Sequence, residues 1–121
     1  WTLRNLWMLA RIMPTQNLQI EFLNKWRNAD KYPAGDPLAP AHIPFAYCFA
    51  ISMMAQPLAW FEATGLPEEA FALAPTIAAY VEHQERIHAG QIFPIGEEPS
   101  GVSWTGFQSI RDATRAGYLA V

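Results

Sequence analysis

The change from helical to strand patterning falls within IHAGQIFPI, residues 87–95. Before it, apolar residues recur at helical spacing from Pro75 to His88, and Gly90 is well placed as the C-terminal cap of that helix. From residue 91 onward the pattern is that of strands, beginning with QIFPI at 91–95. The chain is therefore expected to change from helix-containing units to β structure near residue 90.

Two further strands are predicted beyond this point. Residues 102–110, VSWTGFQSI, alternate between two faces. A charged turn at 111–115 then leads to a hairpin partner at 118–121. This strand runs to the last residue of the sequence, so we expect a β element that is cut short.

The part before residue 87 alternates between helices and strands. The predicted elements are a helix at 3–13, a strand at 18–23, an apolar element at 45–55, a strand at 57–61, a helix start at Pro67 and a second helix from Pro75. The period does not decide whether the apolar element is a strand or a buried helix. Alternation of this kind is typical of parallel βα units.

Composition excludes several classes of protein. The 121 residues suffice for one domain, 51% are hydrophobic and the formal net charge is −3. This balance argues against disorder, against a nucleic-acid-binding surface and against an anionic membrane partner. No apolar run is long enough to predict a membrane span. The single cysteine, Cys48, excludes an intrachain disulfide and is interpreted as a buried, inert thiol.

The proline-rich stretch 24–44 carries the best candidate site. It begins with NKWRNADKY at 24–32, directly after a predicted strand, and we expect an ordered loop. Its side chains offer hydrogen-bond donors, acceptors and a flat aromatic face, which suits a polar ligand with apolar faces. With a glutamate at the end of the next strand, the candidate substrate-binding residues are Asn24, Trp26, Arg27, Asn28, Asp30 and Glu62. An ordinary capped surface loop and a solvated carboxylate are the alternatives. Glu21 could hydrogen-bond a ligand-binding residue or form a structural ion pair.

Other chemistry finds little support in the sequence. His83 and His88 are five residues apart, which places them on diverging faces of a helix and argues against a metal site. No glycine-rich phosphate loop and no GxSxG motif occurs. We therefore expect no cofactor and no bound metal.

Several segments together resemble one family. They are NLQIEFLN at 17–24, APAHIP at 39–44, AQPLAWFEATGLPEE at 55–69, IHAGQIFPIGEEPSG at 87–101, WTGFQSI at 104–110 and GYLAV at 117–121. They resemble the α-galactosidase (melibiase-like) glycoside hydrolases of clan D. The likeness spans nearly the whole chain and rests on a series of patterns, not on one signature motif.

The resemblance implies a fold and a chemistry. Residues 1–90 would be the C-terminal part of a (β/α)8 catalytic barrel, and residues 91–121 the first strands of an antiparallel β-sandwich domain. The family uses a retaining mechanism in which one Asp attacks the anomeric carbon and a second acts as acid and base. Neither Asp motif occurs here, so the segment would contribute to the sugar site of a larger enzyme and be inactive alone.

A rival interpretation is a non-catalytic carbohydrate-binding or interaction module, with Trp26, Trp60 and Trp104 as stacking platforms. Both interpretations predict a carbohydrate partner, with no nucleic acid and no membrane. A homo-oligomeric parent protein remains open. The sequence leaves the sugar, the linkage and the cellular compartment undetermined.

Overall fold

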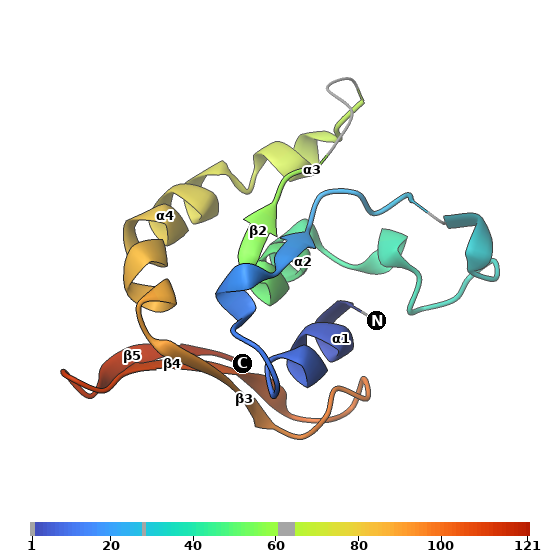
Figure 1. The fold of residues 1–121 in the computed structure, drawn as a ribbon. Helices are drawn as coiled ribbons and strands as arrows, with labels where there is room; N and C mark the ends of the chain where they lie inside the picture. Colours follow the sequence, from blue (N-terminus) through green and yellow to red (C-terminus); the bar gives the residue numbers. More distant parts are fainter. Residues whose placement is uncertain (1, 28, 61–64) are drawn as a thin grey trace.

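Strands β1 (Gln19–Glu21) and β2 (Gln56–Leu58) pair in parallel in the computed structural model (Figure 1). The structure describes residues 2–27, 29–60 and 65–121. The register places Ile20 opposite Pro57. Both strand predictions are confirmed in position, although each strand has only three residues. Residue 61, the end of the second predicted strand, lies outside the described residues.

The helices surround this pair of strands. Their bounds are α1 (Thr2–Leu9), α2 (Phe45–Ser52), α3 (Glu68–Phe71) and α4 (Ala74–His88), with single 3-10 turns η1 (Thr15–Asn17), η2 (Ala29–Lys31) and η3 (Pro40–His42). The apolar element at 45–55, which the period left open, is the helix α2. It buries Phe45, Phe49 and Ser52, which lie on one helical face, against β1 and β2.

The end of α4 differs from the prediction in one respect. The helix ends at His88 as expected, but Ala89 is its C-terminal cap and has right-handed helical backbone angles. Gly90 is not among the residues with positive φ. A Cβ at Gly90 would lie 2.2 Å from Ser109 Oγ, so this glycine is required by the close approach of a neighbouring strand.

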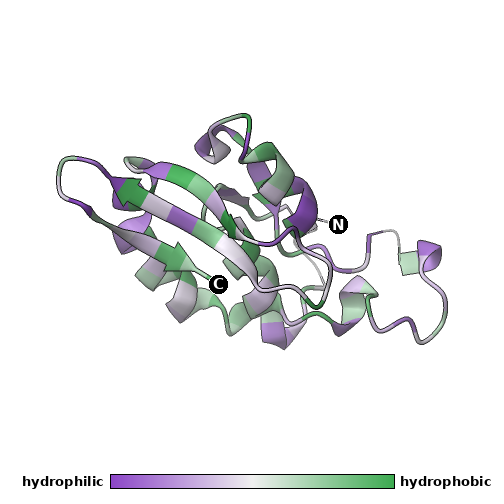
Figure 2. Ribbon diagram, turned by 90° about the horizontal axis from the view of Figure 1, so that it is seen from below, coloured by the Kyte–Doolittle hydropathy of each residue, from purple (hydrophilic) through white to green (hydrophobic). Residues whose placement is uncertain are grey.

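The last 31 residues form a three-stranded antiparallel sheet in the order β3 (Gln91–Gly96), β4 (Thr105–Arg111) and β5 (Ala116–Ala120). The predicted hairpin is confirmed as the pair of β4 and β5, and β3 also pairs with β4. The inner face of the sheet buries Ile92 and Phe107 beside α4. The Trp7 indole of α1 donates a hydrogen bond of 3.2 Å to the Ile95 carbonyl oxygen. Figure 2 views this sheet from below, where apolar segments lie among polar ones along its strands.

One buried hydrophobic cluster joins the four α-helices to β3 and β4. Its aromatic centre is Phe49, whose ring meets Phe22 edge-on at 5.0 Å and Tyr80 at 5.4 Å between centroids. The same cluster extends to Ile92 and Phe107 beyond residue 90. Burial of apolar area of this kind is the main favourable contribution to folding.

The expected architecture, a fragment of a (β/α)8 barrel followed by a β-sandwich, is wrong. The described residues form a two-stranded parallel sheet and a separate three-stranded antiparallel sheet, and no barrel is evident in them. The antiparallel strands form one sheet that packs against helices, and no second sheet faces it in this part of the chain. The sequence correctly indicated the local alternation, but the pairing of strands does not follow from it.

Candidate functional site

The candidate site lies where β1 and β2 both end, because parallel strands bring their carboxyl ends to the same edge. Arg27, on the loop after β1, places NH1 3.1 Å from Glu21 Oε2. The Arg27 guanidinium also lies 5.3 Å from the ring centroid of Trp60, which follows β2. The Trp60 side chain is 62% exposed. An aromatic ring and a cation are thus held together at the surface by two different strands.

The backbone before Arg27 is held by Asn24. The Asn24 Oδ1 atom accepts a hydrogen bond of 2.9 Å from the Arg27 backbone N–H. Asparagine side chains often close turns in this way, because the short amide reaches the backbone a few residues on. Asn24 therefore shapes the loop that presents the arginine.

A second cation of the same loop points into the molecule. The Lys25 side chain is largely buried, with Nζ 4.2 Å from the ring centroid of Phe45 and 3.9 Å from Glu69 Oε2. Burial raises the pKa of the nearby Cys48 thiol, and the positive charge of Lys25 opposes that rise. Lys25 therefore serves the packing of α2 and α3 in this structure, and Arg27 is the cation that faces outward.

The structure brings only some of the predicted site residues into contact. Asn24 and Arg27 are in contact, Trp26 is exposed on the same loop, and Asp30 is exposed in η2. Asn28 and Glu62 lie outside the described residues.

Two residues that contact Arg27 are not in the predicted binding set. They are Trp60, the aromatic residue that follows β2, and Glu21, the last residue of β1. The alternation of LQIEFL indicated Glu21 as a partner for a binding residue, and the structure shows that this partner is Arg27. No local pattern could have shown that Trp60 and Arg27 meet, because they follow two different strands and lie far apart in the sequence.

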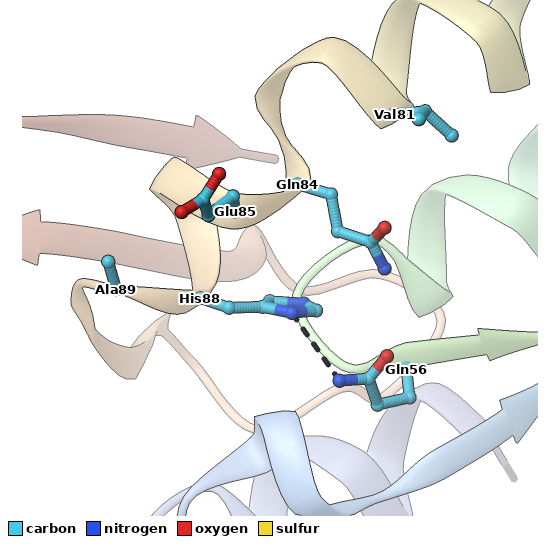
Figure 3. Close-up of a pocket in the computed structure, with 6 residues that line it drawn as sticks. All are labelled: Gln56, Val81, Gln84, Glu85, His88 and Ala89. Atoms are coloured by element: carbon cyan, nitrogen blue, oxygen red, sulfur yellow. Dashed lines mark hydrogen bonds between the residues drawn. The ribbon is translucent and has the colours of Figure 1, made fainter.

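A cavity of about 530 Å³ lies at the opposite, amino end of β2 (Figure 3). It is lined by Gln56, Val81, Gln84, Glu85, His88 and Ala89. His88 Nε2 lies 2.9 Å from the Ala55 carbonyl oxygen, and its Nδ1 lies 3.4 Å from Gln56 Nε2. Both contacts are satisfied together when Nε2 donates to the carbonyl oxygen and Nδ1 accepts from the Gln56 side-chain amide. His88 is thus held as a structural link between α4 and β2.

Two further classes of site are absent from the described residues. No group of three or more His, Cys, Asp or Glu side chains that could hold a metal ion occurs in the described part of the chain. None of its helices combines the length and apolar character needed to cross a membrane. The candidate site is therefore the polar cluster at the carboxyl ends of β1 and β2, formed by Glu21, Arg27 and Trp60.

Comparison with known proteins returned no match: neither a family model, nor a curated protein, nor a solved structure resembles this chain at a significant level.

Proposed function

We propose that this protein binds carbohydrate at the carboxyl ends of β1 and β2. The observation that supports the proposal is the arrangement of Arg27, which is held by Glu21 against the exposed ring of Trp60. A sugar ring has C–H faces that pack on an aromatic surface and hydroxyl groups at its rim that need hydrogen-bond partners. Trp60 supplies the first kind of surface, and the remaining N–H groups of Arg27 supply donors beside it.

We extend the proposal to a reaction, because the sequence resembles a family of glycoside hydrolases. The segments that resemble α-galactosidase-like glycoside hydrolases include LQIEFLN, which contains Glu21, and AQPLAWFEATG, which contains Trp60. We infer that the cluster contributes sugar-binding groups to an enzyme that cleaves terminal α-galactosides or related α-glycosides. The two catalytic aspartates are proposed to lie outside this chain, so the chain binds the sugar without cleaving it.

A second candidate function is a non-catalytic carbohydrate-binding or interaction module that uses several exposed aromatic side chains. The exposure of Trp104, which at 63% matches that of Trp60, favours this candidate. Trp104 lies between β3 and β4 on the antiparallel sheet, and Trp60 lies beside the parallel one. A module of this kind would use both surfaces.

The test is a titration of the protein with methyl α-galactopyranoside, in which binding is measured by calorimetry or NMR. We expect Arg27→Ala and Trp60→Ala each to weaken binding by about tenfold, since a hydrogen bond to a charged group and an aromatic contact are each worth on the order of 1 kcal/mol or more. Arg11→Ala is the matched control, because Arg11, which follows α1, lies 5.8 Å from the ring centroid of Trp7 in that helix. Equal losses with Arg11→Ala would contradict the proposed site.

Trp104→Ala separates the two candidate functions. Unchanged binding supports the single site at β1 and β2, whereas a loss equal to that of Trp60→Ala supports the module. Hydrolysis of nitrophenyl α-galactoside is measured in parallel, and we expect no turnover by this chain alone. Turnover would show that the catalytic groups are present in the chain and would contradict their proposed location.

A further inference from the structure

The two side chains of the ion pair between Glu21 and Arg27 differ in solvent exposure. The Glu21 side chain is 24% exposed and lies on the strand, whereas the Arg27 side chain is 48% exposed and lies on the outer loop. One carboxylate oxygen of Glu21, Oε2, lies 3.1 Å from Arg27 NH1. The other oxygen, Oε1, is buried and has no hydrogen-bond partner among the described residues. The Glu21 carboxylate is therefore less exposed than the Arg27 guanidinium, and Arg27 compensates its negative charge.

This arrangement cancels the positive charge that Arg27 would otherwise present to a ligand. A ligand carboxylate that approached the guanidinium would lie close to the Glu21 carboxylate as well, and two like charges at short range repel. Of the two further cations of the loop, Lys25 is largely buried between Phe45 and Glu69 and is turned inward, and Lys31 is exposed in η2, next to Asp30 in the sequence. A hydroxyl group can accept a hydrogen bond from Arg27 without bringing this repulsion.

We infer that Glu21 is a specificity-determining residue, which makes the site select neutral sugars over sugars that carry a carboxylate, such as uronic acids. This inference rests on the proposed carbohydrate-binding function. Glu21 then has two effects on a bound sugar. Glu21 orients the Arg27 guanidinium, and it removes the attraction of Arg27 for acidic ligands.

The experiment compares two ligands of the same ring configuration, methyl α-galactopyranoside and its 6-carboxylate, methyl α-galactopyranosiduronate. For the unmodified protein we expect the neutral sugar to bind more tightly. Glu21→Gln keeps the size of the side chain and removes its charge. We expect this variant to shift the ratio of the two dissociation constants by about fivefold toward the acidic sugar, the effect of one partly exposed charge pair. A residue with a merely structural role would change both constants equally.

Glu98→Gln is the matched control, because Glu98 forms an ion pair with Arg4 on another surface. It should leave the ratio unchanged. If Glu21→Gln does not fold, the unmodified protein is titrated at low and high salt. The preference for the neutral sugar should then shrink as salt screens the repulsion.

The outcomes distinguish this inference from the function on which it rests. If the neutral sugar binds but Glu21→Gln leaves the ratio unchanged, or the preference does not depend on salt, Glu21 does not set the selectivity and the site still stands. If the unmodified protein prefers the acidic sugar, the inference is wrong. If it binds neither sugar, the carbohydrate-binding function fails, and the inference fails with it.

Discussion

The buried hydroxyl of Ser109 donates a hydrogen bond of 2.6 Å to the carbonyl oxygen of Ile87. Ser109 lies on β4, the central strand of the antiparallel sheet, and Ile87 lies in the last turn of α4. Both residues are buried. The bond therefore joins the sheet to the helix that also packs near β2, at the point where the chain changes from helix to strand.

Replacing Ser109 by Ala should destabilise the protein by about 1 kcal/mol, the typical value of a buried hydrogen bond whose acceptor retains another partner. The remaining partner of the Ile87 carbonyl oxygen is the Gly90 backbone N–H at 3.2 Å. The measurement is the midpoint of urea denaturation. Thr76→Ala, an exposed change on α4, is the control and should have little effect. An equal loss in both variants would contradict the role of Ser109.

Replacing Gly90 by Ala should destabilise by about 1–3 kcal/mol through overpacking. The added Cβ would lie 2.2 Å from Ser109 Oγ and 3.1 Å from the Ile110 carbonyl oxygen. Because the nearest atom belongs to Ser109, the double variant with Ser109→Ala should lose less than the sum of the single losses. Strictly additive losses in urea denaturation would show that the hydroxyl is not the obstacle.

The stability of the protein should fall at high pH because of Tyr80. Burial raises the pKa of the Tyr80 hydroxyl from 10.0 to about 12, and a hydrogen bond with Gln84 acts in the opposite direction. A raised pKa in the folded state means that this stability is present below about pH 10 and is lost as the pH rises toward about 12. Comparison of the unfolding free energies of the protein and of Tyr80→Phe over this range isolates the effect. Parallel pH curves would contradict it.

The Cys48 thiol should react slowly in the folded protein. Burial raises its pKa above the ordinary value, and Lys25 only partly opposes this rise, so little thiolate forms near neutral pH. Alkylation by iodoacetamide should therefore be slower in the native protein than in urea. Lys25→Met should slow it further, because the opposing charge is removed. Faster reaction of the Lys25→Met variant would indicate that access, and not charge, limits the rate.

Asn24 should affect sugar binding through the loop alone. Its Oδ1 accepts a hydrogen bond from the Arg27 backbone, so Asn24→Ala should weaken the binding of methyl α-galactopyranoside severalfold. Asn24→Asp retains an acceptor oxygen at the same place and should preserve most of the affinity. Direct contact of the Asn24 amide with the sugar would instead make both variants equally weak.

Local patterns predicted several elements of this protein correctly. The helix from Pro75 to His88 and the strands after residue 90 follow from apolar period and turn chemistry, which act over a few residues. The sequence also indicates the loop 24–32 as a candidate site, because it follows a strand directly, and this stays a prediction. Local period could not decide the state of α2, since its residues are apolar all round and only contact with β1 and β2 selects the buried face.

The sequence by itself therefore determined most of the helices and strands, although not the state of α2. It also determined which loop carries polar and aromatic side chains, because both depend on neighbours along the chain. Only the tertiary structure decided that β1 and β2 form a two-stranded sheet and not part of a barrel. It also decided that Gly90 accommodates Ser109, and that Glu21, Arg27 and Trp60 meet at one edge. Such contacts join residues distant in sequence, and their free energy depends on packing in three dimensions, which no local pattern records.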